Sequence, residues 1–203
     1  MRRLLWALPF VLVGCGPTQT AKPVEPESLQ TVSTKELSLS LPKHWKVVDL
    51  TLEDIEKAMA NWDKEYLEKY KPIFEGLRTQ PMYKTFAVDL DSTELNFSDN
   101  MSVVVLPAPG VTLEQLCKAT ESDLKALARA GTSPKSARAK YNGQEFGTSL
   151  TPLKGPQGAS LVSYAYYTHH KDQSITITFT CLESHAGTFG EVVEQTMRTV
   201  KLQ

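Results

Sequence analysis

The sequence predicts an α+β domain with a central, mainly antiparallel sheet flanked by helices, in the manner of an α/β/α sandwich. Three observations predict this class. Segments with apolar residues at every second position follow one another between residues 137 and 181, with no helical pattern between them. Stretches with apolar residues three and four apart lie near residues 112–128 and 186–199. The strands and helices do not alternate regularly, as they would in a parallel doubly wound sheet, so antiparallel pairing is expected.

The first fifteen residues have the three zones of a signal peptide for export. Arg2 and Arg3 precede an apolar run at residues 4–13, and a small residue follows. This run is too short to span a bilayer, because a membrane-spanning helix needs about 20 apolar residues. We therefore expect residues 1–14 to be removed. An ordinary secretory signal that is cut elsewhere is the alternative.

Leu12-Val13-Gly14-Cys15 resembles the bacterial lipobox, in which a transferase attaches lipid to the cysteine and a peptidase cuts just before it. The resemblance implies that Cys15 is the lipid attachment site and that a palmitate analogue would label the chain. Gly16 follows the cysteine, and no aspartate stands there to suggest retention at an inner membrane. We therefore expect a lipoprotein of the cell envelope, anchored in the outer membrane and facing the periplasm.

The composition predicts a flexible tether followed by a single domain. Residues 15–35 contain Pro17, Pro23 and Pro26 among polar residues, which predicts a flexible tether that carries the lipidated cysteine. The remaining residues, 36–203, fit a single domain. The formal net charge of −1 argues against a basic protein that binds nucleic acid.

The domain is expected to open with a strand and a helical insert. Leu37, Leu39 and Leu41 alternate with serines, and the strand that they predict ends at Pro42. The helical insert spans about residues 52–77, where a helix N-cap is followed by apolar residues three and four apart. We expect Pro72 to stop or kink this helix before a second short piece.

Two strands and a helix follow. Residues 85–90 alternate in hydropathy and residues 101–106 are almost continuously apolar, so both segments are predicted strands. Thr112 and Gln115 have the spacing of a capping box, which predicts that a helix begins there. Gly131 is placed to end this helix.

The last part of the chain predicts four hairpin-linked strands and a closing helix. Asn142-Gly143 favours a two-residue turn between strands near residues 137–141 and 146–150. Residues 159–168 are expected to pair with residues 174–181, and a final helix is expected over about residues 186–199.

A family resemblance is carried by element order and by several short segments of this sequence. These are Leu37-Ser-Leu-Ser-Leu-Pro followed by Trp45, Val103-Val-Val-Leu, Thr112-Leu-Glu-Gln-Leu, Tyr141-Asn-Gly and Thr176-Ile-Thr-Phe-Thr-Cys. Residues 36–203 resemble the PsbP-like fold group, which includes bacterial lipoprotein relatives. The resemblance implies a central antiparallel sheet used for assembly or binding rather than catalysis, and it brings no set of catalytic residues. The insert is longer than in the plant subunits, which argues against a photosynthetic role.

Cys117 and Cys181 are the two cysteines that remain after Cys15. Cys117 lies on the apolar stripe of its predicted helix and Cys181 on the inward face of its predicted strand. Packing of this helix on this strand would bring the two sulfur atoms together, and an exported chain favours a disulfide. Two buried free thiols are the alternative.

Other candidate chemistry is weak. His169 and His170 adjoin Asp172, but neighbouring residues of a strand point to opposite faces, so a solvated turn is the better interpretation than a metal site. His44 and His185 are isolated in the sequence, and none of the usual metal, redox or phosphate motifs is present. No catalytic residue, metal or cofactor is therefore assigned.

The sequence thus predicts a membrane-anchored, non-enzymatic binding or assembly module. Its expected partners are the membrane, through the N-terminal lipid, and an unidentified envelope protein or small ligand. A small envelope hydrolase and a carrier of a hydrophobic ligand are the alternatives. The first requires a histidine or acid with a perturbed pKa in a cleft, and the second an apolar pocket of roughly 300 Å³ or more.

Overall fold

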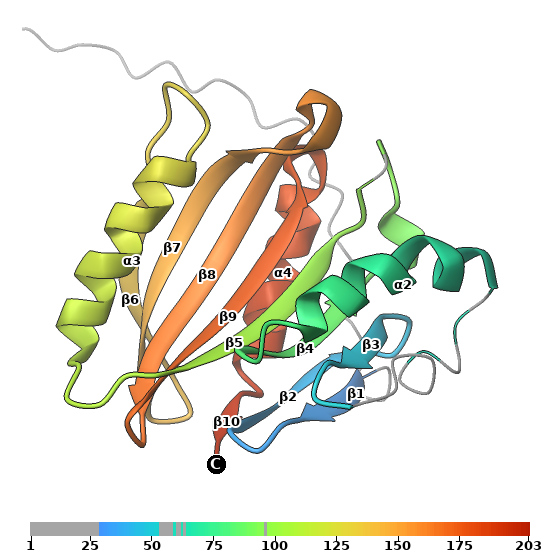
Figure 1. The fold of residues 1–203 in the computed structure, drawn as a ribbon. Coiled ribbons are helices and arrows are strands. Elements are labelled where there is room, and N and C mark those ends of the chain that lie inside the picture. Colours follow the sequence, from blue (N-terminus) through green and yellow to red (C-terminus); the bar gives the residue numbers. More distant parts are fainter. Residues whose placement is uncertain (1–28, 53–58, 60–61, 63, 96) are drawn as a thin grey trace, which may run out of the picture.

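The computed structural model describes residues 29–52, 59, 62, 64–95 and 97–203 (Figure 1). Its strands are β1 (Leu29–Ser33), β2 (Leu37–Pro42), β3 (Lys46–Asp49), β4 (Tyr83–Val88), β5 (Asn100–Pro107), β6 (Lys135–Tyr141), β7 (Gln144–Lys154), β8 (Ser160–His170), β9 (Gln173–Leu182) and β10 (Lys201–Leu202). Its α-helices are α2 (Lys64–Arg78), α3 (Leu113–Leu127) and α4 (Ala186–Met197). Short 3₁₀ turns are η2 (Leu90–Ser92), η3 (Pro156–Gly158) and η4 (Glu183–His185).

The strands form two antiparallel sheets. The large sheet has the order β3-β4-β5-β9-β8-β7-β6, and β1, β2 and β10 form a separate small sheet. The predicted class is therefore confirmed. The small sheet was not expected, and its strand β1 lies within the segment for which the sequence predicted a tether.

Both faces of the large sheet are covered. On one face, Ile177 and Phe179 of β9 share a core with Phe189 and Val193 of α4 and with the leucines of β2. On the opposite face, Phe86 and Val88 of β4 pack beneath α2, while α3 lies over β7 and β8. Figure 1 shows α2 and α3 in front of the sheet and α4 behind it. The layers are thus α4 with the small sheet, then the large sheet, then α2 and α3.

Local sequence signals account for the helix starts and turns. Thr112 and Gln115 form the predicted capping box at the start of α3. Asn142 and Gly143 both have positive φ in the β6–β7 turn, as a two-residue hairpin turn of this type requires.

Helix α2 corrects one prediction about the helical insert. It continues from Lys64 to Arg78 with Pro72 inside it, so Pro72 does not end the helix. Pro72 is exposed, while Tyr70 and Phe74 on either side of it pack into the same cluster. We infer that this burial offsets the backbone hydrogen bond that proline cannot make. The predicted N-cap of the insert, at Thr51 and beyond, falls largely outside the described residues.

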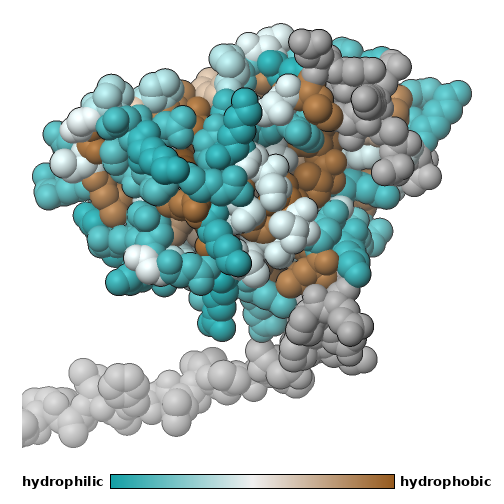
Figure 2. Space-filling model, turned by 90° about the horizontal axis from the view of Figure 1, so that it is seen from below, coloured by the Kyte–Doolittle hydropathy of each residue, from teal (hydrophilic) through white to brown (hydrophobic). Residues whose placement is uncertain are grey.

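The surface has no single large apolar face on the side that Figure 2 shows. Seen from below, it is mostly hydrophilic and its apolar residues form separate patches (Figure 2). Within the described part of the chain, no helix combines the length and hydropathy needed to cross a bilayer.

Candidate functional site

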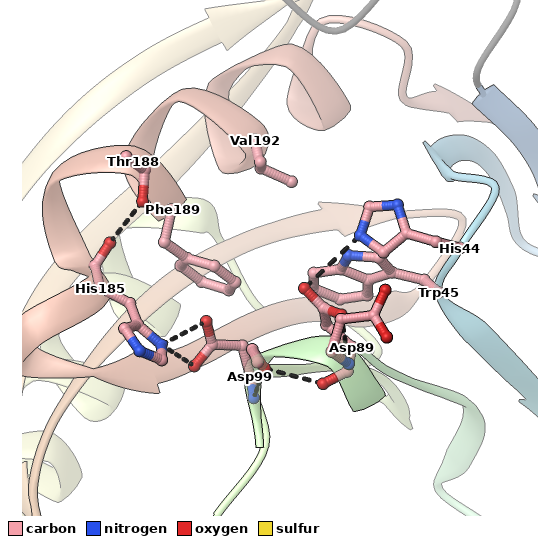
Figure 3. Close-up of a pocket in the computed structure, with 10 residues that line it drawn as sticks. His44, Trp45, Asp89, Asp99, His185, Thr188, Phe189 and Val192 are labelled. Atoms are coloured by element: carbon pink, nitrogen blue, oxygen red, sulfur yellow. Dashed lines mark hydrogen bonds and ion pairs between the residues drawn. The ribbon is translucent and has the colours of Figure 1, made fainter. Parts of the chain in front are cut away.

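One end of the large sheet brings together residues from five distant segments. Because β3, β4, β5 and β9 are antiparallel neighbours, the start of β3, the end of β4, the start of β5 and the end of β9 meet at this end. Helix α4 begins there too, after η4. Residues at and beside these ends line an open pocket of about 300 Å³, which we call the α4 pocket (Figure 3). It is lined by His44, Trp45, Asp89, Asp91, Ser92, Asp99, His185, Thr188, Phe189 and Val192.

His185 and Asp99 form the most buried polar pair of this pocket. The Nδ1 atom of His185 lies within hydrogen-bond distance of the Asp99 carboxyl, at 3.0 Å from Oδ2 and 3.2 Å from Oδ1. The backbone N–H of Leu182 also donates to Asp99 Oδ1, at 3.2 Å. Asp99 is only 4% exposed, and burial raises the pKa of its carboxyl above the ordinary value, although His185 acts in the opposite direction. The pair ties the end of β9 to the start of β5.

The second ring nitrogen of His185 also faces a carboxylate. His185 Nε2 lies 3.5 Å from Glu94 Oε2. An imidazolium ring, which has two N–H donors, would therefore have an acceptor on each side.

His44 and Asp89 form a second pair at the opposite side of the pocket. His44 Nε2 lies 3.5 Å from Asp89 Oδ2. Asp89 also accepts from the backbone N–H of Asp91 through Oδ1, at 3.1 Å, and so caps η2. Figure 3 shows the two histidine–aspartate pairs on either side, with Phe189 between them and Trp45 beside His44.

The apolar part of the pocket comes from stacked rings. Trp45 and Phe189 have ring centroids 6.0 Å apart and planes 19° apart, and Val192 lies on the next turn of α4. Both rings belong to the core between α4 and the large sheet, so their positions are fixed by packing. The pocket thus has a rigid aromatic wall and an acidic, histidine-containing rim.

The two hydroxyl side chains in the pocket lining are engaged elsewhere. Thr188 donates to the backbone oxygen of His185, at 3.2 Å. Ser92 donates to the backbone oxygen of Asp89 and accepts from the N–H of Asp99. Among the described residues, neither hydroxyl forms a hydrogen bond with a histidine ring nitrogen. A hydroxyl nucleophile would need such a bond.

The structure contradicts the predicted disulfide between Cys117 and Cys181. Cys181 lies with Ile177 and Phe179 on the α4 face of the sheet. Cys117 lies on the other face, because a Cβ atom at Gly147 would come 2.7 Å from its sulfur, and Gly147 pairs with Tyr167 on the face that α3 covers. Both cysteines are free thiols, and the sheet separates them. The periodicity placed each cysteine on an inward face without showing that the two faces are opposite.

The other sequence candidates fall outside the pocket. Cys15 lies outside the described residues. His169 Nε2 bonds to the backbone oxygen of Ala108 at 3.0 Å, and the residues that follow His170 form the β8–β9 turn. Among the described residues, no three histidine, cysteine or acidic side chains are placed to hold a metal ion.

Sequence reasoning found His44 and His185 only as isolated histidines and did not single out Asp89 or Asp99. These aspartates follow β4 and precede β5, and the contact between Asp99 and His185 joins residues 86 apart. An acid at each of two strand ends was the available signal, but pairing of those strands had to be known before it could be used.

Two solved structures share the fold. The chain is similar to the cyanobacterial PsbP protein CyanoP from Synechocystis sp. PCC 6803, with a TM-score of 0.53, 14% identity, and coverage of 93% of this chain and 100% of that one. It is also similar to LpqN of Mycobacterium tuberculosis, described as involved in cell envelope biogenesis, with a TM-score of 0.56, 8% identity, and coverage of 86% and 90%. No protein-family model and no curated protein sequence matches the chain.

Proposed function

Since the chain has a PsbP-like fold, we propose that it is a lipid-anchored protein of the bacterial cell envelope whose domain binds a partner or small ligand at the α4 pocket. The observation that carries this proposal is the pocket itself, in which charged and aromatic side chains from five segments converge. Convergent polar groups in an apolar concavity are the usual form of a binding site. The role in envelope biogenesis stated for LpqN agrees with an envelope location.

Binding fits the pocket better than hydrolysis does. The ring nitrogens of His185 face Asp99 and Glu94, and the nearby hydroxyls of Thr188 and Ser92 donate to backbone oxygens. A hydrolase would use one histidine nitrogen to activate a hydroxyl or a water molecule. Here both nitrogens are already placed against carboxylates, an arrangement that fixes the ring.

A carrier of long hydrophobic ligands is also less well supported. At about 300 Å³ the pocket is at the small end of ligand sites, and its rim is acidic. It has room for a small molecule or for one side chain of a protein partner. An acyl chain would have to lie along carboxylates, whose desolvation is costly.

The lipid anchor rests on the sequence from Arg2 to Cys15. Metabolic labelling with a palmitate analogue should tag the wild-type chain, and Cys15→Ala should abolish the label because it removes the thiol that accepts lipid. Cys117→Ala is the matched control, since it removes a thiol within the domain, and it should keep full labelling. Equal labelling of Cys15→Ala and wild type would refute the anchor.

The binding role is tested by crosslinking in the native envelope. The full chain, Asp91→Asn in the pocket rim and Asp123→Asn on the exposed surface of α3 would each be captured after crosslinking, with the Cys15-deleted soluble form as a further control. A crosslinked species present with wild type and Asp123→Asn but depleted with Asp91→Asn supports binding at the pocket. Recovery that depends on the lipid and not on the pocket contradicts it.

A further inference from the structure

We propose that the α4 pocket binds an organic ammonium group attached to a short apolar stem. This rests on the proposed function and names the chemistry of the ligand. The pocket combines carboxylates at its rim with an aromatic wall, and these are the two features that recognise such a cation.

The charge of the pocket excludes an anion as the favoured ligand. Asp89, Asp91 and Asp99 line it, and Glu94 stands beside His185. Its lining contains no lysine or arginine among the described residues. The four carboxylates exceed the two histidines in number, so the rim stays negative if both rings are protonated and Asp99 is ionised. The start of α4 would attract an anion, but the Asp99 carboxylate already lies there, bonded to His185.

The apolar wall of the pocket indicates that the ligand also has an apolar part. Trp45 and Phe189 are stacked, and Val192 extends the wall along α4. A small hydrated inorganic ion would make no use of the apolar part of this lining. An ammonium group on a short carbon stem would bond to the rim carboxylates and cover the aromatic edges at once.

The position of the pocket suggests where such a group could come from. Leu29, the first described residue, pairs with Pro42, and the side chain of Gln30 donates to the backbone oxygens of Pro42 and Trp45. The chain therefore enters the domain next to the loop that carries His44 and Trp45. Thirteen residues separate Leu29 from Cys15, the proposed site of lipid attachment. The ammonium group could thus belong to a free amine or to the headgroup of a membrane lipid.

Calorimetry on the full lipidated chain tests the proposal. The chain would be reconstituted in phosphatidylglycerol nanodiscs, whose headgroup carries no cation, and titrated with hexylamine, hexanol and hexanoate, with empty nanodiscs subtracted. Hexylamine should bind most tightly, hexanol more weakly and hexanoate most weakly. Asp89→Asn/Asp91→Asn should weaken hexylamine about tenfold, because it removes two charge-assisted contacts, while Asp123→Asn should bind like wild type.

Two results would overturn the proposal: hexanoate binding as tightly as hexylamine, or the double variant binding hexylamine like wild type. If the double variant proves misfolded by circular dichroism, Asp91→Asn alone replaces it, because residue 91 is exposed. Failure of hexylamine to bind, with crosslinking still dependent on Asp91, would reject the ammonium ligand and leave the proposed binding function intact.

Changing the nanodisc lipid distinguishes the two possible sources of the ammonium group. In discs that also contain phosphatidylethanolamine, occupation of the pocket by the headgroup would lower the apparent affinity of wild type for hexylamine but leave that of the double variant unchanged. An unchanged wild-type affinity would assign the pocket to a free amine.

Discussion

Asp99 is the residue on which the geometry of the α4 pocket most depends. It holds His185 through Nδ1 and receives the backbone N–H of Leu182, so one carboxylate fixes the ring, the end of β9 and the start of β5. Burial opposes its ionisation and raises its pKa, and the nearby Asp89 carboxylate adds a smaller effect in the same direction. The protein therefore keeps an acid at a position where its charged form is costly.

Asp99 should make stability depend on pH in a defined direction. Its carboxyl keeps its proton to higher pH in the native state than in the unfolded chain, whose pKa is about 3.9. The native state then binds more protons than the unfolded state above that pH. The free energy of unfolding of wild type should consequently fall, relative to Asp99→Asn, as pH rises from about 3.9 through the raised pKa, by about 1.4 kcal/mol for each unit of pKa difference.

Urea denaturation between about pH 3 and 7 measures this difference. Asp123→Asn, on the exposed surface of α3, controls for the loss of one carboxylate without burial. If wild type instead gained stability over Asp99→Asn with rising pH, the favourable contact with His185 would outweigh burial, and the assigned direction of the pKa shift would be wrong.

The two domain cysteines should stay reduced, because the large sheet lies between them. Burial raises the pKa of the Cys181 thiol to about 12, with a further contribution from Asp99. Cys117 is only partly buried. Iodoacetamide at about pH 8 should therefore alkylate Cys117 in the native protein and Cys181 only after unfolding. An intact mass two hydrogens lighter than that of the dithiol form would contradict the opposite placement of the two residues.

At the residue scale, the sequence identified candidate side chains but not the residues that they contact. Isolated histidines such as His44 and His185 have no local pattern that reveals an acid partner. Their partners Asp89 and Asp99 lie 45 and 86 residues away in the chain and are brought near by strand pairing. Contacts of this kind depend on sheet order, which periodicity does not encode.

At the element scale, short-range chemistry was predictive where it acts alone. The capping box at Thr112 and the Asn142-Gly143 turn need only neighbours in sequence, and both are present. Pro72 was expected to stop or kink the helix, and it does not stop it, because tertiary packing of Tyr70 and Phe74 opposes the local preference. The sheet face that α3 would cover also could not be inferred from the helix stripe.

Gly147 of β7 marks the contact between α3 and the sheet. A Cβ atom there would meet the ring of Tyr167 and would lie 2.7 Å from Cys117 Sγ. Gly147→Ala should therefore destabilise the protein by about 1–3 kcal/mol, because the buried Tyr167 ring has little space to move. Urea denaturation measures the loss, and adding Cys117→Ala should restore part of it.

A matched substitution separates this clash from any general effect of replacing glycine. Gly187 lies in the first turn of α4, and a Cβ atom there would meet nothing within 4 Å. Gly187→Ala should be neutral or stabilise by up to about 1 kcal/mol, because alanine has the higher helix propensity. Equal effects of the two substitutions would show that α3 does not pack on Gly147 as described.

At the scale of the whole molecule, the order of the major elements and the antiparallel class followed from the sequence, while the small sheet did not. Strand β10 has two residues and β1 has five, and neither shows a clear apolar alternation. Both are strands because β2 lies between them and hydrogen bonds to each. A segment that becomes a strand only by pairing with another strand has no strand pattern of its own, so its sequence predicts a tether or a tail.

The place of β1 in the small sheet leads to a test by truncation. Val32 of β1 is buried in the main core, and Gln30 binds the β2–β3 connection. A chain of residues 29–203 should match the stability of residues 16–203 to within about 0.5 kcal/mol. A chain of residues 35–203 should lose roughly 2–4 kcal/mol, because it gives up one buried valine and several hydrogen bonds. Thermal and urea unfolding of the three soluble chains measure this difference. Equal stability of residues 35–203 and 29–203 would show that β1 does not stabilise the domain.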